Sequence, residues 1–88
     1  MFLLYVGNLL YLKMKLLTRE LLEEYGFTLN RRKTTPEKTV LTKDNFDVVI
    51  KSDGIYYSNM GFDYPLKDND ILRKMYFEVR REKLVVTT

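Results

Sequence analysis

The dipeptide Asp53-Gly54 lies between two runs rich in β-branched and aromatic residues, 46–52 and 55–60. This pattern indicates a two-residue β-hairpin turn, because the favoured type I′ turn needs a positive φ at both of its central positions. The turn sets a register in which Ser52 pairs with Ile55, and two further pairs follow: Ile50 with Tyr57, and Val48 with Asn59. One face of this hairpin then carries the side chains that we expect in the core, namely Phe46, Val48, Ile50, Ile55 and Tyr57.

Helices are predicted on both sides of this strand-rich region. Over residues 18–26, Thr18 is suited to cap the N-terminus of a short helix and Gly26 to end it. Near the other end of the chain, Asp68 or Asn69 begins a helix that reaches about Arg81. Its apolar residues recur at spacings of three and four and form one stripe, consisting of Ile71, Leu72, Met75, Tyr76 and Val79.

The segments between the helices predict the rest of the sheet. Residues 27–33 and 38–42 alternate or are β-branched and are read as strands, whereas 61–66 are read as irregular or as a short extension. Residues 84–88 form either a last strand or a frayed tail. We therefore expect an α+β fold with a short N-terminal helix, an antiparallel meander of three or four strands, and a C-terminal amphipathic helix packed on one sheet face.

Residues 1–13 differ from the rest of the chain, because the first twelve are almost wholly apolar. The run is too short for a helix that crosses a bilayer, and the lysines follow it rather than precede it, which does not match a secretory signal. We predict a single domain over 14–88 and no membrane span. Three interpretations of 1–13 stay open: an annotated start upstream of the true one at Met14, an extra element that covers the core, or a membrane-associating segment.

The 88 residues include no His, no Cys and no Trp. The chain therefore lacks the usual proton shuttle near neutral pH, the thiolate nucleophile and the common zinc ligands. The acidic run Asp68-Asn69-Asp70 does not match a calcium loop and is better explained as a helix cap. We predict no catalytic residue, no cofactor and no metal, hence no enzyme, and the absence of Cys fits a cytoplasmic location.

The outer face of the C-terminal helix is the strongest candidate for a binding site. There we expect Phe77 and Leu84 to be flanked by four cations: Arg73, Lys74, Arg80 and Arg81. An aromatic side chain ringed by cations suits either the anchor of a protein interface or a stacking platform for a nucleic-acid base. In the alternative interpretation, Phe77 is buried beneath residues 1–16 or in a homo-oligomer.

A second basic spot consists of Arg31, Arg32, Lys33 and Lys38. Such residues attract phosphates, but they also protect edge strands against aggregation. The formal net charge of +3 does not by itself indicate nucleic-acid binding. We expect a non-enzymatic protein-interaction module, and the alternative is a weak nucleic-acid-binding protein that uses the basic residues around the C-terminal helix.

Several of these features together resemble a known group of proteins. They are a short helix that ends in Tyr25-Gly26-Phe27, the Asp53-Gly54 turn, and a terminal helix with Met75-Tyr76-Phe77 before Glu82-Lys83-Leu84. Over roughly residues 15–84, the chain resembles short α+β proteins encoded in gut Bacteroidetes genomes and in their phages and mobile elements. The resemblance implies an α+β fold and suggests an accessory role in a phage or mobile element, but it carries over no functional residue.

Overall fold

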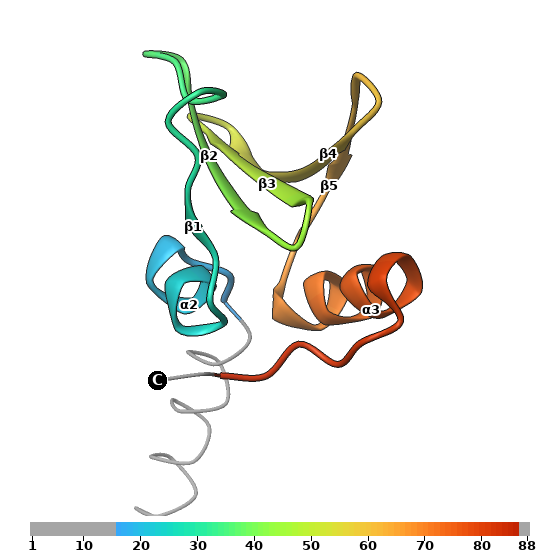
Figure 1. The fold of residues 1–88 in the computed structure, drawn as a ribbon. Helices are drawn as coiled ribbons and strands as arrows, with labels where there is room; N and C mark the ends of the chain where they lie inside the picture. Colours follow the sequence, from blue (N-terminus) through green and yellow to red (C-terminus); the bar gives the residue numbers. More distant parts are fainter. Residues whose placement is uncertain (1–15, 87–88) are drawn as a thin grey trace, which may run out of the picture.

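The computed structural model describes residues 16–86, so the predictions for residues 1–13 lie outside the described part of the chain. The described elements are α2 (Arg19–Glu24), β1 (Thr28–Leu29), β2 (Lys38–Lys43), β3 (Phe46–Lys51), β4 (Gly54–Asn59), β5 (Phe62–Pro65) and α3 (Asn69–Arg80). The strands form one antiparallel five-stranded sheet in the order β1-β2-β3-β4-β5. Figure 1 shows α2 and α3 on the same side of this curved sheet. The α+β class is confirmed.

The predicted number of three or four strands is wrong, because a hairpin turn at Met60-Gly61 adds β5. These two residues have φ values of 52° and 83°, and they pair Asn59 with Phe62. Methionine is not among the residue types that favour a left-handed turn position, so the sequence pattern does not reveal this hairpin. At the other edge of the sheet, the strand predicted over 27–33 is limited to Thr28–Leu29 because residues 31–33 turn.

The β3–β4 hairpin turns one residue earlier than predicted. Lys51 pairs with Gly54, so the turn residues are Ser52 and Asp53, and Val48 pairs with Tyr57 rather than with Asn59. Gly54, with a φ of 156°, instead begins β4. The partner of each β3 residue shifts by two positions, and a shift of two preserves the faces because side chains alternate with a period of two. The predicted inner face is therefore correct although the pairing is not: Phe46, Val48 and Tyr57 are buried, and Ile50 and Ile55 pack against them.

An aromatic cluster centred on Phe46 forms the middle of the core. The Phe46 ring stacks on that of Tyr57, with 4.1 Å between the ring centroids. It also contacts Phe27, which follows α2, at 6.1 Å and Tyr76 of α3 at 5.1 Å. Leu22 of α2, Leu41 of β2 and Leu72 of α3 are fully buried in the same cluster. The two helices and the sheet therefore share one core.

Two hydroxyl groups fix α3 against its neighbours. The Tyr25 hydroxyl donates to Oδ1 of Asn69 at 2.6 Å, which ties the end of α2 to the start of α3. The Tyr76 hydroxyl donates to Oδ2 of Asp44 at 3.0 Å, in the turn between β2 and β3. Burial, together with this hydrogen bond to the carboxylate, raises the pKa of Tyr76 to about 12. Both contacts require α3 to keep one rotation about its axis.

The predicted helix starts are correct, but one residue of the predicted apolar stripe is not in the core. Thr18 caps α2 and Asp68 caps α3, each by accepting a hydrogen bond from a backbone N–H three residues later. Val79, expected in the stripe, is 43% exposed. It shares a helical face with Leu72 but belongs to the last turn of α3, where the core cluster no longer covers that face.

Replacement of Met60 by Asn is expected to raise the free energy of unfolding. Met60 is 89% exposed and has a φ of 52°, so the change removes backbone strain of about 1 kcal/mol without the loss of a core contact. Urea unfolding followed by circular dichroism measures the difference. Ser52→Asn is the matched control, because Ser52 lies in a turn but lacks a positive φ, and it should change little. A Met60→Asn variant no more stable than the natural chain would contradict the turn geometry.

The Tyr76–Asp44 contact predicts a specific sensitivity to alkali. The unfolded chain loses the Tyr76 proton near pH 10 and the folded chain near pH 12, so this contribution to stability is complete below pH 10 and is lost between pH 10 and 12. The full loss amounts to about 2–3 kcal/mol. Urea unfolding across this interval should show a smaller decrease for Tyr76→Phe than for the natural chain, since the lysines titrate in both. Equal decreases in the two proteins would contradict the assignment.

Candidate functional site

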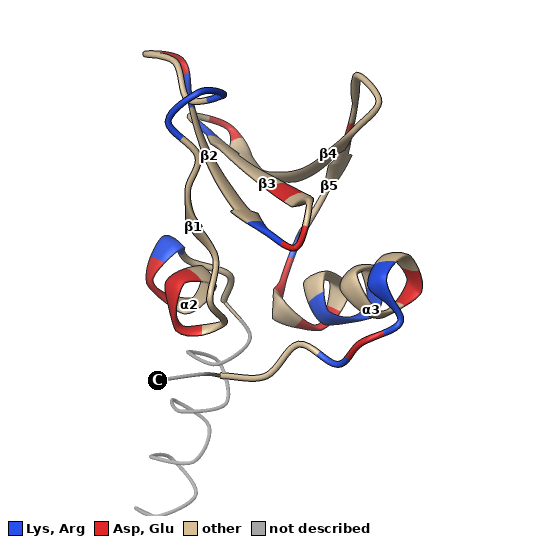
Figure 2. Ribbon diagram, viewed as in Figure 1, with Lys and Arg blue, Asp and Glu red and all other residues tan. Residues whose placement is uncertain are grey.

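An open groove of about 450 Å³ runs between the outer face of α3 and the tail, which we define as residues 81–86. We call it the α3–tail groove. Four of the residues that line this groove were expected at the candidate site: Arg73, Lys74, Phe77 and Leu84. The other two lining residues, Asp70 and Lys83, were not expected there. Figure 2 shows basic residues along α3 and again in the tail.

The geometry of α3 and a reversal of the chain at its end create this groove. Asp70, Arg73, Lys74 and Phe77 follow a spacing of three and four residues and therefore form a stripe on one side of the helix. At the end of the helix, Arg81 adopts a left-handed conformation with a φ of 60°, and its N–H donates to the carbonyl oxygen of Phe77 at 2.8 Å. The chain then turns back, and the tail runs beneath α3 toward α2 (Figure 1).

The two apolar residues of the groove have different roles. Phe77 is 46% exposed, whereas Leu84 is 2% exposed and belongs to the core cluster. The expectation that Leu84 is a surface residue is therefore wrong, because its side chain anchors the tail in the core. Phe77 is the large apolar side chain that this groove presents to solvent.

The expected ring of four cations is only partly formed. Arg73 and Lys74 line the groove, but Arg80 and Arg81 do not. Arg80 is half-buried and its Nε has no hydrogen-bond partner in the described structure. It lies near Tyr57, where burial raises the pKa of the hydroxyl and the Arg80 guanidinium opposes this rise. Arg81 is exposed at the end of the helix.

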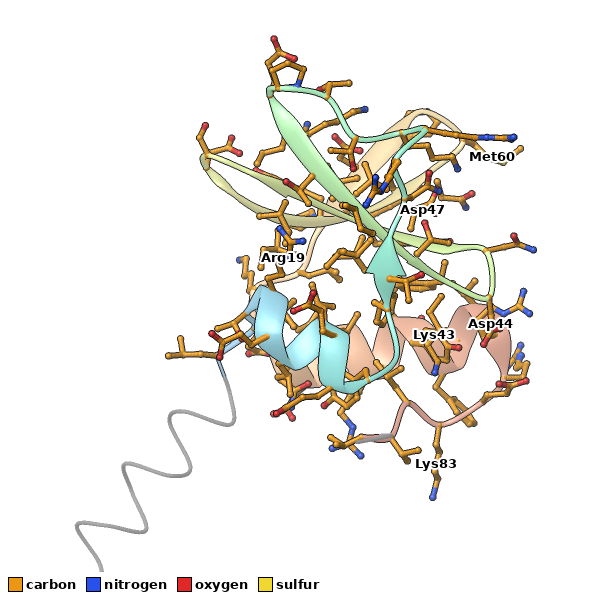
Figure 3. The ribbon with its side chains drawn as sticks, turned by 60° about the vertical axis from the view of Figure 1, so that its left-hand side comes forward. Arg19, Lys43, Asp44, Asp47, Met60 and Lys83 are labelled. Atoms are coloured by element: carbon orange, nitrogen blue, oxygen red, sulfur yellow. The ribbon has the colours of Figure 1, made fainter. Side chains whose placement is uncertain are left out.

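Lys83 is the third cation that lines the groove, and the sequence did not predict it as a residue of the site. It comes to the groove because the chain reverses at Arg81, and an arginine at a left-handed helix end is not a recognisable signal for such a reversal. Figure 3 shows the Lys83 side chain projecting at the end of the molecule opposite Met60. Within residues 16–86, the ion pairs are Arg19–Glu23, Lys33–Asp47 and Lys51–Asp63, so none involves Arg73, Lys74 or Lys83.

A second hollow, of about 270 Å³, adjoins the first. It lies between α2, the start of α3 and the tail, and we call it the α2–tail groove. Its lining is mostly apolar and consists of Leu21, Tyr25, Asn69, Arg73, Leu84, Val85 and Val86. Arg73 and Leu84 line both grooves, so the two hollows meet at these residues.

The structure does not gather the second basic spot into one surface. Arg31 and Arg32 line a polar hollow beside the β2–β3 turn, whereas the Lys33 ammonium forms an ion pair with Asp47 of β3. Lys38, at the start of β2, lies opposite Lys51 in the sheet. Figure 2 shows the loop that carries 31–33 far from α3, beyond the sheet. The two basic regions are therefore not parts of one continuous surface.

Two further structural features bear on the chemistry of the chain. In the described range, 16–86, no three Asp or Glu side chains lie close enough together to hold a metal ion. None of the helices in the same range is long and apolar enough to cross a membrane.

Comparison of the chain with protein-family models, with curated proteins and with solved structures finds no match. The resemblance to short proteins of gut Bacteroidetes and their mobile elements stays a prediction. The geometry of the two grooves is therefore the basis for any functional proposal.

Truncation of the two apolar groove residues should affect stability very differently. Leu84→Ala removes a buried side chain and should lower the free energy of unfolding by about 2–5 kcal/mol. Phe77→Ala acts on a half-exposed side chain and should cost less than about 1 kcal/mol. Urea unfolding of the two variants tests this difference. A larger loss for Phe77→Ala than for Leu84→Ala would show that the roles of these residues are reversed.

Proposed function

We propose that this chain is a non-enzymatic protein-interaction module that binds its partner in the α3–tail groove. The observation that carries the proposal is a half-exposed Phe77 in a groove bordered by Arg73, Lys74 and Lys83, which form no ion pair within residues 16–86. A cytoplasmic location and an accessory role in a phage or mobile element stay predictions from the sequence.

The residues of the groove suit the energetics of protein recognition. Large aromatic and arginine side chains in concave sites dominate binding free energies at protein interfaces. Phe77 supplies such a side chain, and the helix holds its backbone in place. Cations on the rim of an interface favour an acidic partner and increase the rate of association. The partner that fits this arrangement therefore presents an apolar side chain next to carboxylates.

Weak nucleic-acid binding is the second candidate, and the placement of the cations favours it less. A nucleic acid carries a charge on every phosphate, so a binding surface needs cations along a continuous path. The cations of the groove are separated from Arg31 and Arg32 by the sheet (Figure 2). Protein binding requires only the local arrangement around Phe77.

Affinity capture from a native lysate of the source cells tests the proposal, with the natural chain, Phe77→Asp and Val79→Asp as baits. Val79 is a close control because it lies on the same helix and is 43% exposed, against 46% for Phe77, but it does not line the groove. We expect Phe77→Asp to lose the captured proteins and Val79→Asp to retain them, with or without nuclease. Equal capture by the two variants would contradict the groove as the binding site. Loss of capture after nuclease treatment would favour nucleic acid.

A further inference from the structure

The α3–tail groove and the α2–tail groove meet at Arg73 and Leu84, which line both. We propose that the two grooves form one docking channel for an acidic protein segment that carries two apolar anchor residues. In this arrangement one anchor lies on Phe77, the other lies beside Val86, and Arg73 binds a carboxylate between them. This inference rests on the proposed function and specifies the chemistry of the partner.

The α2–tail groove is suited to a second apolar side chain. Val85 and Val86 are 57% and 51% exposed, and Leu21 is half-buried beside them. Among the described residues, the polar groups of this hollow are the Tyr25 hydroxyl, the Asn69 amide that accepts a hydrogen bond from it, and the Arg73 guanidinium. Exposed aliphatic side chains around a hollow are unfavourable in water, and an apolar anchor that covers them gains the corresponding transfer free energy.

Arg73 occupies the position that sets the charge of the partner. It lies between the two apolar hollows, and no ion pair within the described residues engages its guanidinium. A guanidinium binds a carboxylate with two parallel hydrogen bonds, which gives geometric specificity as well as attraction. Lys74 and Lys83 add positive charge around Phe77. The described lining of the α3–tail groove holds these three cations and one carboxylate, that of Asp70, so its net charge is positive. The channel therefore favours carboxylates next to the first anchor and between the two anchors.

The form of the channel favours a protein segment over the other polyanionic partners. Proteins bind a membrane surface by inserting protruding apolar side chains into it, whereas the apolar residues of this channel line two hollows. A nucleic-acid strand needs cations along its whole path, and Arg73 is the one cation among the residues of 16–86 that line the α2–tail half of the channel. An acidic segment with two apolar residues matches both halves.

Binding of synthetic peptides to the full chain tests this channel by fluorescence anisotropy. The probes are a Glu-rich peptide with two leucines, two peptides in which one or the other leucine is replaced by serine, and a peptide with Lys in place of every Glu. We expect the two-leucine peptide to bind most tightly. Each serine replacement should weaken binding about tenfold, because a buried leucine contributes free energy of that order. The Lys peptide should not bind.

Variants of the protein assign the second anchor to the α2–tail groove. Val86→Asp should weaken binding of the two-leucine peptide about tenfold, because one of its leucines is then no longer buried. Its affinity should fall to that of a one-leucine peptide for the natural chain. Arg73→Glu should lower the affinity for every acidic peptide, and Val79→Asp should leave these affinities unchanged. Val85→Asp, at the other exposed valine of the same hollow, repeats the Val86 test if that variant does not fold.

The outcomes separate this inference from the proposed function. If a one-leucine peptide binds as tightly as the two-leucine peptide, the channel is overturned and the α3–tail groove still accounts for partner binding. If no acidic peptide binds, the proposal that the partner is an acidic segment is overturned. It is also overturned if single-stranded DNA or phosphatidylglycerol vesicles bind more tightly than the peptides and Arg73→Glu abolishes that binding. Failure of the proposed function is recognised differently, by lysate capture that does not depend on Phe77.

Discussion

The contact between Phe46 of β3 and Tyr76 of α3 determines which surfaces of this molecule face solvent. Phe46 touches Phe27, Tyr57 and Tyr76, so the sheet, the segment after α2 and the last helix all meet at its ring. The hydrogen bond from Tyr76 to Asp44 adds a directional restraint that a purely apolar contact lacks. Together these contacts fix the rotation of α3 about its axis. The side of the helix that carries Arg73 and Phe77 is exposed as a consequence.

The tail converts the exposed side of α3 into a groove. Leu84 inserts into the core, and its neighbours Lys83 and Val85 are thereby held beside the helices. The same leucine is thus part of the core and part of the lining of both hollows. Because burial of one side chain secures the tail, a change that weakens the core at Leu84 should also deform the binding surface. Stability and recognition are coupled at this residue.

The sequence predicts the helices, their capping residues and the inner face of the β3–β4 hairpin, because local hydrogen bonding and a two-residue alternation determine these features. It fails at two left-handed positions, where the residue type does not favour that backbone conformation. Met60 forms the unrecognised turn before β5, and Arg81 reverses the chain after α3. The burial of Leu84 and the position of Lys83 both follow from that reversal, so these parts of the site could not be predicted. The stripe with Arg73, Lys74 and Phe77 was predictable from helical periodicity alone.

The rotation of α3 is the central claim, and NMR with a soluble paramagnetic agent tests it most directly. Such an agent broadens the signals of exposed rings and spares those of buried rings. In the isotope-labelled full chain, the Phe77 ring should broaden strongly, while the rings of Phe46 and Tyr76, which are 0% and 1% exposed, stay sharp. A sharp Phe77 ring together with a broadened Tyr76 ring would contradict the account, because α3 would then present its other face to the sheet.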